Sequence, residues 1–99
     1  MKVILKDQRQ FEATRCNINL NTLTESEDEK ATINIFVEEG DIGEVTVEEL
    51  GAMLTPDNIS EFSLVTSTMT KQVAGKKLLA IGENITDEQY SIDIRIAKA

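Results

Sequence analysis

The feature that most constrains the fold of this chain is an alternation of apolar and polar residues at every second position. It is most regular near the end, where Tyr90, Ile92, Ile94 and Ile96 are apolar and the residues between them are polar. Successive side chains of a strand point to opposite faces of its sheet, so this pattern predicts a strand over 90–98 with one buried face. The other segments that predict strands are 2–6, 11–20, 31–37, 62–66 and 77–85.

The second predicted strand changes phase partway along. Phe11 and Ala13 occupy odd positions, whereas Cys16 and Ile18 occupy even ones. A strand cannot switch faces without an extra residue, so we expect a bulge or a bend at residues 14–15. Together with the strand before it, this part of the chain predicts a hairpin whose second strand is bent.

A single short helix is predicted over 47–54. Thr46 and Glu49 form a capping box, in which the Thr46 hydroxyl accepts from the Glu49 amide and the Glu49 carboxylate reaches back to the Thr46 amide. The apolar residues that follow recur at helical spacing. Pro56 either stops this helix or starts a new turn, with Thr55 as the cap of that turn.

Segments without an apolar period predict the loops. They are the acidic segment 21–30, the glycine-containing segment 38–44 and the polar segment 67–75. A turn is predicted over 84–89. Gly82 interrupts the strand predicted around it, which indicates a further bulge or a close approach of another backbone.

These elements define the expected fold class. The chain has 99 residues, which is enough for a single domain over 1–99 with one core. Because sequential hairpins dominate, we expect a mainly β fold at the boundary to α+β, either an antiparallel β-sandwich or a partly open barrel, of about six strands with one short helix. The expected core residues are Val3, Leu5, Phe11, Ile18, Ile33, Ile35, Leu50, Leu54, Phe62, Leu64, Leu79, Ile81, Ile92 and Ile94.

Residues that could carry chemistry are few. The chain contains no histidine, which removes the usual general base near neutral pH and the commonest metal ligand. Its one cysteine, Cys16, lies inside a strand pattern without a histidine to activate it, so we expect a buried and inert thiol. We predict no catalytic, cofactor-binding or metal-binding residues and no enzymatic activity. A small enzyme would need a carboxylate such as Asp93 or Glu12 in a cleft that perturbs its pKa.

The charged residues exclude some partners. The net charge of −8 repels phosphate backbones and anionic lipid surfaces, so we expect neither a nucleic acid nor a membrane as a partner. The acidic clusters at 25–29 and 38–44 lack the ligand spacing of an EF-hand loop, and solvated loop charge is the expected interpretation. Lys71, Lys76 and Lys77 have no aromatic residue among them, so we expect them to flank a strand as solubilising charges.

Three stretches of the sequence carry a resemblance to a known group of proteins. They are the opening MKVILKDQRQFEATRCNI, the middle VTVEELGAMLTPDNISEFSLV and the close LLAIGENITDEQYSIDIRIAKA. In these stretches the chain resembles a loosely defined group of small proteins encoded by phages and prophages of Gram-positive bacteria. It departs from that group at residues 73–76, where VAGK stands in place of a glycine–aromatic step. The resemblance implies a virion-associated or assembly protein without catalytic residues.

The sequence leaves two functions open. The resemblance implies a structural or assembly module that binds tail, baseplate or capsid subunits, or forms a homo-oligomer, and that uses no cofactor and no small-molecule substrate. No apolar segment is long enough for a signal peptide or a membrane span, so we expect such a protein in the bacterial cytoplasm during synthesis and in the virion afterwards. The net charge of −8 instead favours a small regulatory or inhibitory protein whose acidic face imitates nucleic acid and blocks a basic partner. The concentration of the acids in two loops and at the helix start favours the first function.

Overall fold

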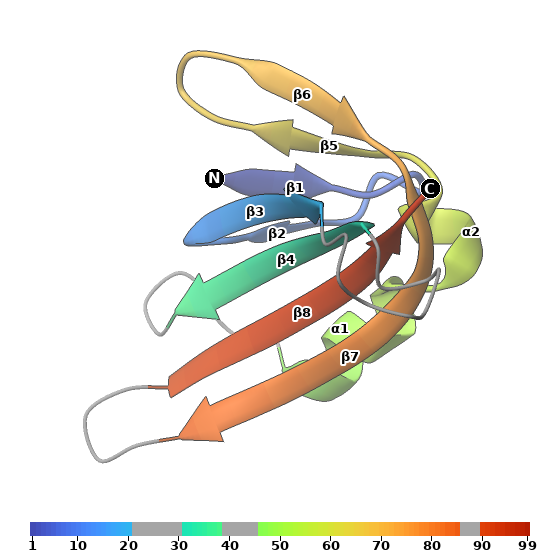
Figure 1. Cartoon of the computed structure of the whole chain (residues 1–99). Helices are drawn as coiled ribbons and strands as arrows, with labels where there is room; N and C mark the ends of the chain where they lie inside the picture. The colour runs from blue at the N-terminus through green and yellow to red at the C-terminus, as the bar shows by residue number, and fades with distance from the viewer. Residues whose placement is uncertain (21–30, 39–45, 86–89) are drawn as a thin grey trace.

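The fold consists of two antiparallel sheets that face each other, with two short helices packed beside them (Figure 1). The computed structural model describes residues 1–20, 31–38, 46–85 and 90–99. In chain order the elements are β1 (Lys2–Ile4), β2 (Gln10–Glu12), β3 (Arg15–Leu20), β4 (Ala31–Glu38), α1 (Val47–Met53), α2 (Pro56–Ile59), β5 (Phe62–Val65), β6 (Thr70–Val73), β7 (Gly75–Ile85) and β8 (Tyr90–Lys98).

Each sheet has four strands. Sheet A has the strand order β2-β1-β5-β6, and sheet B has the order β3-β4-β8-β7. All pairings within both sheets are antiparallel, so the predicted antiparallel β-sandwich is confirmed, with eight strands and two helices among the described residues. The sheets do not close into a barrel. Since β8 lies between β4 and β7, the strongly alternating last segment is an internal strand and not an edge.

The change of phase in the second predicted strand marks the place where the chain passes from sheet A to sheet B. Ala13, just after β2, is buried. The Thr14 amide donates to the Phe36 carbonyl oxygen at 2.8 Å, and Arg15 lies opposite the same Phe36 in the β3–β4 register. Two successive residues therefore face one, which is the bulge that the change of phase predicts. It lets odd positions before it and even positions after it point into one core.

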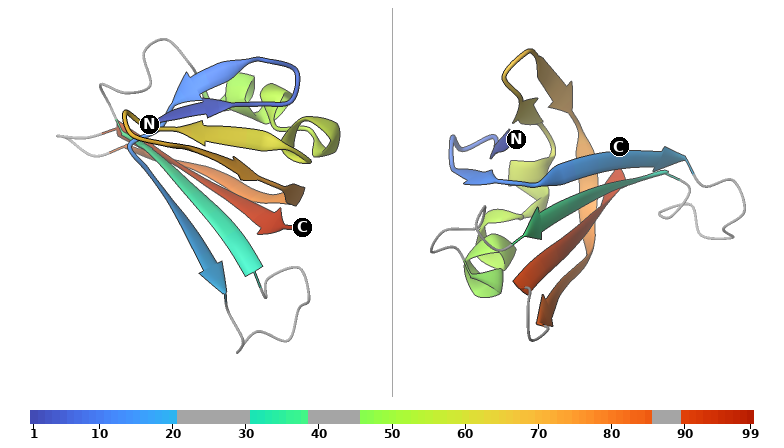
Figure 2. Two further views of the ribbon diagram at one scale, coloured as in Figure 1. Left: turned by 90° about the horizontal axis from the view of Figure 1, so that it is seen from above. Right: turned by 90° about the vertical axis from the view of Figure 1, so that its left-hand side faces the viewer.

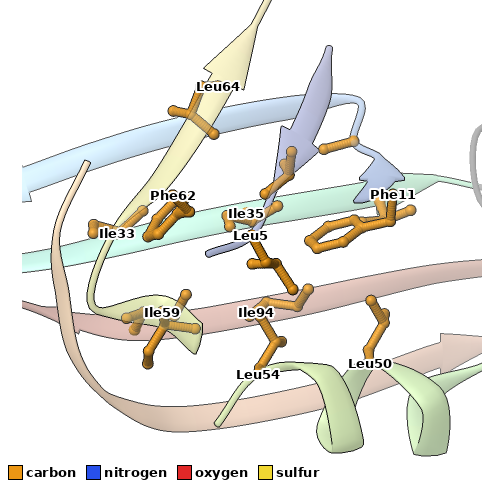
Figure 3. Packing of buried hydrophobic residues seen from close by; sticks show 14 of the residues in the cluster. Leu5, Phe11, Ile33, Ile35, Leu50, Leu54, Ile59, Phe62, Leu64 and Ile94 are labelled. Atoms are coloured by element: carbon orange, nitrogen blue, oxygen red, sulfur yellow. The ribbon is translucent and has the colours of Figure 1, made fainter. Parts of the chain in front are cut away.

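The core lies between the two sheets, and both sheets and both helices contribute to it (Figure 3). Most of the predicted core is confirmed, since the buried residues include Val3, Leu5, Phe11, Ile33, Ile35, Leu50, Leu54, Phe62, Leu64, Ile92 and Ile94. Ile18 and Ile81 are half-buried and pack against this cluster. The core is completed by Ala13, Val37, Ile59, Val73, Ile96 and Ala97.

The prediction of Leu79 as a core residue is wrong. In the β7–β8 register, Leu78 lies opposite Ile96 and Ala80 lies opposite Arg95, so Leu79 is the extra residue of a bulge. The bulge changes which positions of β7 face inward. Leu78 packs against the core cluster in its place, whereas Leu79 stays half-buried outside that cluster.

The prediction of a bulge or close approach at Gly82 is also wrong, and the feature belongs to Gly75 instead. Gly82 pairs regularly with Asp93, and a Cβ atom at this position would have nothing within 4 Å. A Cβ atom at Gly75 would lie 2.8 Å from the Ile59 carbonyl oxygen and 2.8 Å from Cγ2 of Ile96. The backbones of β7 and α2 therefore approach closely where β7 begins, and a side chain there would collide with both neighbours.

Both helices begin at caps that the sequence predicts. α1 follows Thr46, whose hydroxyl accepts from the Glu49 amide at 3.2 Å, and it ends one residue earlier than predicted. Thr55 caps α2 in the same way, accepting from the Asn58 amide at 3.4 Å, and Pro56 is the first residue of that helix. Both helices contact β7.

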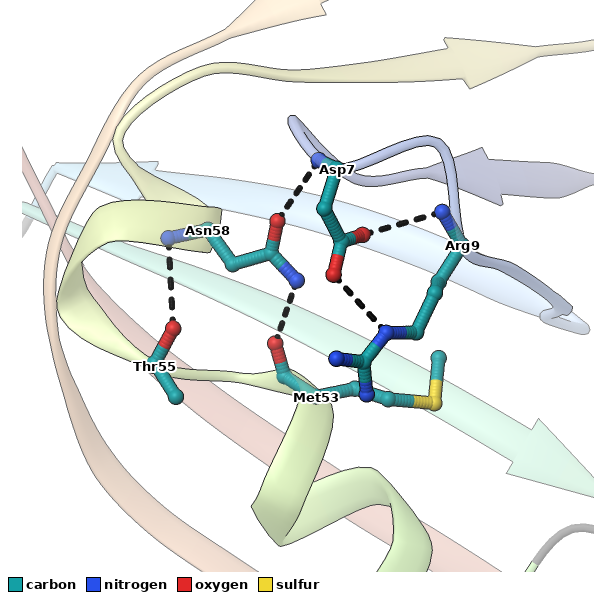
Figure 4. A network of polar contacts seen from close by, with 5 residues as sticks. All are labelled: Asp7, Arg9, Met53, Thr55 and Asn58. Carbon is teal, nitrogen blue, oxygen red and sulfur yellow. Dashed lines mark hydrogen bonds and ion pairs between the residues drawn. The ribbon is translucent and has the colours of Figure 1, made fainter.

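The side chain of Asn58 ties the helices to the turn between β1 and β2 (Figure 4). It is buried; its Nδ2 donates to the Met53 carbonyl oxygen at 2.7 Å, and its Oδ1 accepts from the Asp7 amide at 2.8 Å. The Asp7 carboxylate in turn accepts from the Arg9 amide at 2.9 Å and lies 2.8 Å from Nε of Arg9. We call this part of the molecule, made of the β1–β2 turn, α1, α2 and the start of β7, the helix side.

The predicted loop over 67–75 is partly wrong, because it contains β6 and the start of β7. Of the residues in β6 only Val73 is buried, so this short strand shows no apolar alternation. The loop predicted over 21–30 lies outside the described residues, as do the parts of the other predicted loop and turn at 39–44 and 86–89.

Candidate functional site

A groove lies between β3, at the end of sheet B, and the β5–β6 hairpin, at the end of sheet A. It consists of two adjoining hollows of about 340 and 390 Å³, which share Ile18 and Lys71. We call it the open groove. The residues that line it are Met1, Cys16, Ile18, Leu64, Thr66, Met69, Lys71, Gln72, Val73, Ala74 and Lys98.

The groove exists because the two sheets diverge at these ends. In both views of Figure 2, β3 and the β5–β6 hairpin run in clearly different directions. Sheets that cross in this way bury only part of their inner faces against each other. The inward side chains of β3, Cys16 and Ile18, are therefore only half-buried, whereas Ile33 and Ile35 on the neighbouring strand β4 are fully buried.

The wall of the groove that the β5–β6 hairpin forms includes an exposed methionine. Met69 is 61% exposed, and it is the one large apolar side chain that stands this far into solvent in the described part of the chain. Its backbone is held in the β5–β6 turn by Thr66, whose amide donates to the Met69 carbonyl oxygen at 2.9 Å and whose hydroxyl accepts from the Met69 amide at 3.2 Å. Met69 is thus presented by a defined turn, in a position where a bound molecule could cover it.

Two lysines line the groove, both exposed, on strand positions that share a face with buried core residues. Lys71 lies opposite Leu64 in the β5–β6 register and two residues before the buried Val73, so it shares their face of sheet A. Lys98 follows the buried Ile96 by two residues and shares its face of sheet B. Among the described residues that line the two hollows, none is an aspartate or a glutamate. The groove is therefore apolar and cationic, in a chain whose net charge is −8.

Cys16 lies in the floor of the groove, half-buried. Burial raises the pKa of the Cys16 thiol, and the nearby charge of Lys71 opposes this effect only in part. The thiol is consequently protonated near neutral pH, which is the state of a poor nucleophile.

The four sheet edges differ in how well they could accept another strand. β2 has three residues and β6 has four, and β7 is interrupted by bulges near Lys76 and Leu79. β3 has six residues, and its pairing with β4 runs without a register shift. Its other side faces no strand among the described residues. Short and bulged edges resist the addition of a strand, so β3 is the edge best suited to accept one.

The remaining residues that the sequence singled out do not come together. Lys71 lies in the groove, in β6, whereas Lys76 and Lys77 lie in β7 and do not line the groove. The Glu12 carboxylate lies 3.8 Å from the Met1 amino group, and Asp93 is exposed in β8.

Within the described ranges, no three histidine, cysteine or acidic side chains are grouped so that they could hold a metal ion. The acidic clusters at 25–29 and 39–44 lie outside these ranges. α1 and α2 have seven and four residues, and the part of the chain that the structure describes contains no helix long and apolar enough to cross a membrane.

No protein-family model, no curated protein and no solved structure matches the chain. Sequence reasoning also missed the groove. The missing element was β6, because without it neither the place of Lys71 in the groove nor the hairpin that forms one wall could be predicted. The pair of apolar residues Leu64 and Val73, nine positions apart around a polar turn, was the available indication of that hairpin.

Proposed function

We propose that this protein is a non-enzymatic interaction module that binds a partner protein by accepting one of its strands at the edge of β3. The observation that carries this proposal is the edge itself, which is six residues long, regular and bordered by the open groove. The unpaired backbone amides and carbonyls of such an edge can bond to an added strand, and side-chain pockets beside the edge supply specificity.

The composition of the chain supports a binding role over a catalytic one. It has no histidine, and the thiol of Cys16 has a raised pKa. A protein that acts through a surface needs neither a general base nor a nucleophile. The resources that the groove does offer, apolar area and two cations, are those of a recognition surface.

The biological setting that we propose is a virion or its assembly, with tail, baseplate or capsid subunits, or further copies of the chain, as partners. It rests on the resemblance to phage and prophage proteins. The genes on either side of the coding sequence test it. We expect them to encode tail or capsid proteins, and an operon of metabolic genes would rule this setting out.

The role of the β3 edge is tested with two proline variants, Asn17→Pro and Ile18→Pro. Adjacent amides of a strand point to opposite sides, so one variant removes a bond to β4 and unfolds more easily, while the other removes only an amide of the outer edge. Light scattering and native mass spectrometry are applied to the protein alone and to the protein co-expressed with the products of its neighbouring genes.

We expect the wild-type chain to form a defined oligomer or a complex of fixed stoichiometry. The proline variant that keeps its thermal stability should lose that assembly. Two outcomes contradict the proposal: a wild-type chain that stays monomeric and binds none of the co-expressed proteins, or a stable edge variant that assembles as the wild type does.

A further inference from the structure

We infer that the strand accepted at β3 is an acidic one, an extended segment of a partner protein that turns apolar side chains into the open groove and carboxylates toward Lys71 and Lys98. This inference rests on the proposed function and specifies the chemistry of the partner. It follows from three features of the groove, which are its position relative to the edge, its apolar lining and its charge.

The position of the groove determines where side chains of an added strand would lie. A strand beside β3 continues sheet B, and every second side chain on it points toward sheet A. On β3 these inward positions are those of Cys16 and Ile18, and across the groove they face Leu64 and Lys71 of the β5–β6 hairpin. The inward side chains of the added strand would therefore enter the groove directly.

The lining of the groove favours apolar side chains at the centre of that strand. The two hollows, of about 340 and 390 Å³, are in the range of roughly 300–1,000 Å³ that is usual for ligand sites. Ile18 is shared by both hollows, and Leu64 and Val73 border them on the side of sheet A. Covering these side chains, together with the exposed Met69, removes apolar surface from water.

The charge of the groove favours acids at the flanks of that strand. Lys71 and Lys98 are exposed at the groove, and within the described residues neither has a carboxylate in an ion pair. An entering strand that is basic or purely apolar would leave these ammonium groups repelled or partly desolvated without compensation. An acidic strand pairs with them, so the same two lysines exclude other strands and admit this one.

A symmetric pairing of two copies through β3 is disfavoured by the same charges. In such a dimer the added strand is β3 of the other copy, and its inward side chains are Cys16 and Ile18. Neither is a carboxylate, so Lys71 and Lys98 would lose contact with water without gaining a partner charge. The groove therefore suits a segment of different sequence from β3.

The test uses a labelled peptide with the sequence Glu-Thr-Val-Thr-Val-Thr-Glu. In an extended chain its valines and both glutamates share one face. The control peptide has lysine in place of both glutamates. Fluorescence polarisation measures binding to the wild type and to the variants Lys71→Glu, Lys98→Glu and Lys6→Glu. The last variant is the matched control, because Lys6 is exposed and does not line the groove.

We expect the acidic peptide to bind the wild type and the Lys6→Glu variant equally, and to bind each of the two groove variants about tenfold more weakly. The control peptide should not bind. In excess, the acidic peptide should also slow the alkylation of Cys16, which lies in the floor of the groove. An equal affinity for all three variants, or no binding of the acidic peptide, would overturn the inference.

A further pair of variants tests whether the lysines only keep strands away. If that is their role, the Lys71→Met and Lys98→Met variants should self-associate, and the acidic peptide should bind neither the wild type nor these variants. That result would also overturn the inference. If the peptide does not bind while the stable proline variant still abolishes assembly, the acidic partner is excluded and the proposed function stands. If neither experiment gives the expected result, both are excluded.

Discussion

The helix side and the open groove lie in one small domain, but they differ in how completely their side chains are packed. On the helix side, the buried polar side chain of Asn58 has its oxygen and its nitrogen satisfied, and the backbone at Gly75 is packed so closely that no Cβ atom fits. In the groove, Ile18 is half-buried, Met69 and Lys71 are exposed, and the described lining residues include no carboxylate.

This difference indicates that one region of the domain mainly stabilises the fold and the other mainly provides a binding surface. Buried and satisfied groups stabilise the fold, since each group lost leaves a cavity or an unpaired polar atom. Half-buried apolar groups beside charges contribute less to the stability of the fold. When a partner covers them, the removal of their surface from water makes binding more favourable. Substitutions on the helix side should therefore change stability, and substitutions in the groove should change binding.

The largest expected effect comes from placing a charge at the centre of the core. Ile94→Asp puts a carboxylate where the side chain is 1% exposed, and it should lower the free energy of unfolding by about 3–5 kcal/mol. The comparison variant is Ile18→Asp, at the half-buried position beside Lys71, with an expected loss on the order of 1 kcal/mol. Urea unfolding measures both. Equal losses would show that the groove is as closed as the core.

The second effect concerns the buried amide of the helix side. Asn58→Ala removes the acceptor for the Asp7 amide and the donor to the Met53 carbonyl, and it should cost about 2–3 kcal/mol in urea unfolding. Ser60→Ala is the control, because the Ser60 hydroxyl donates to the Asp57 carbonyl oxygen at an exposed site and its loss should cost less than about 1 kcal/mol. A loss at Asn58 no larger than that at Ser60 would show that this network does not hold the helices in place.

The third effect compares two glycines of the same strand. Gly75→Ala forces a Cβ atom against the Ile59 carbonyl oxygen and Ile96, and overpacking of this kind should cost about 1–3 kcal/mol. Gly82→Ala has open space around it and should leave stability unchanged or raise it by up to about 1 kcal/mol. Thermal unfolding of both variants measures the difference. If Gly82→Ala were the more destabilising of the two, the close approach would lie where the sequence predicted it.

The smallest effect is a dependence of stability on acid. The Arg9 amide donates to the Asp7 carboxylate and lowers the pKa of Asp7, with a smaller contribution in the same direction from Asn58. A group whose pKa is depressed by folding stabilises the fold above its unfolded pKa, about 3.9 for aspartate, and this stabilisation is lost as the pH falls through the folded pKa. The wild type should therefore lose more stability below about pH 4 than the Asp7→Asn variant does. Urea unfolding of both proteins between pH 7 and pH 3 measures this. An equal loss of stability in the two proteins would contradict the prediction.

The features that the sequence predicted correctly are those that depend on near neighbours. Thr46 and Thr55 cap helices because a hydroxyl reaches an amide three residues further along, whatever the rest of the fold does. Ile92 and Ile94 are buried because the period of a strand puts them on one face. The change of phase near Thr14 required a bulge for the same local reason.

The wrong predictions concern positions whose environment is made by distant segments. The bulge at Leu79 is set by the register with β8, and the sequence of β7 alone contains two adjacent leucines that could each face inward. The crowding at Gly75 comes from α2 and β8, which pack against it from elsewhere in the chain. A strand as short and polar as β6 is recognisable only by its pairing with β5.

The sequence by itself determined that this chain is mainly β, with antiparallel aliphatic strands and a capped helix, because period and caps are local properties of the backbone and its nearest side chains; it left a sandwich and a partly open barrel as alternatives. Only the tertiary structure decided which strands are edges and that Lys71 and Lys98 line one groove together with Ile18 of β3. The physical reason is that an edge, a register and a groove are relations between segments far apart in the chain. Their energies come from contacts that no window of neighbouring residues contains.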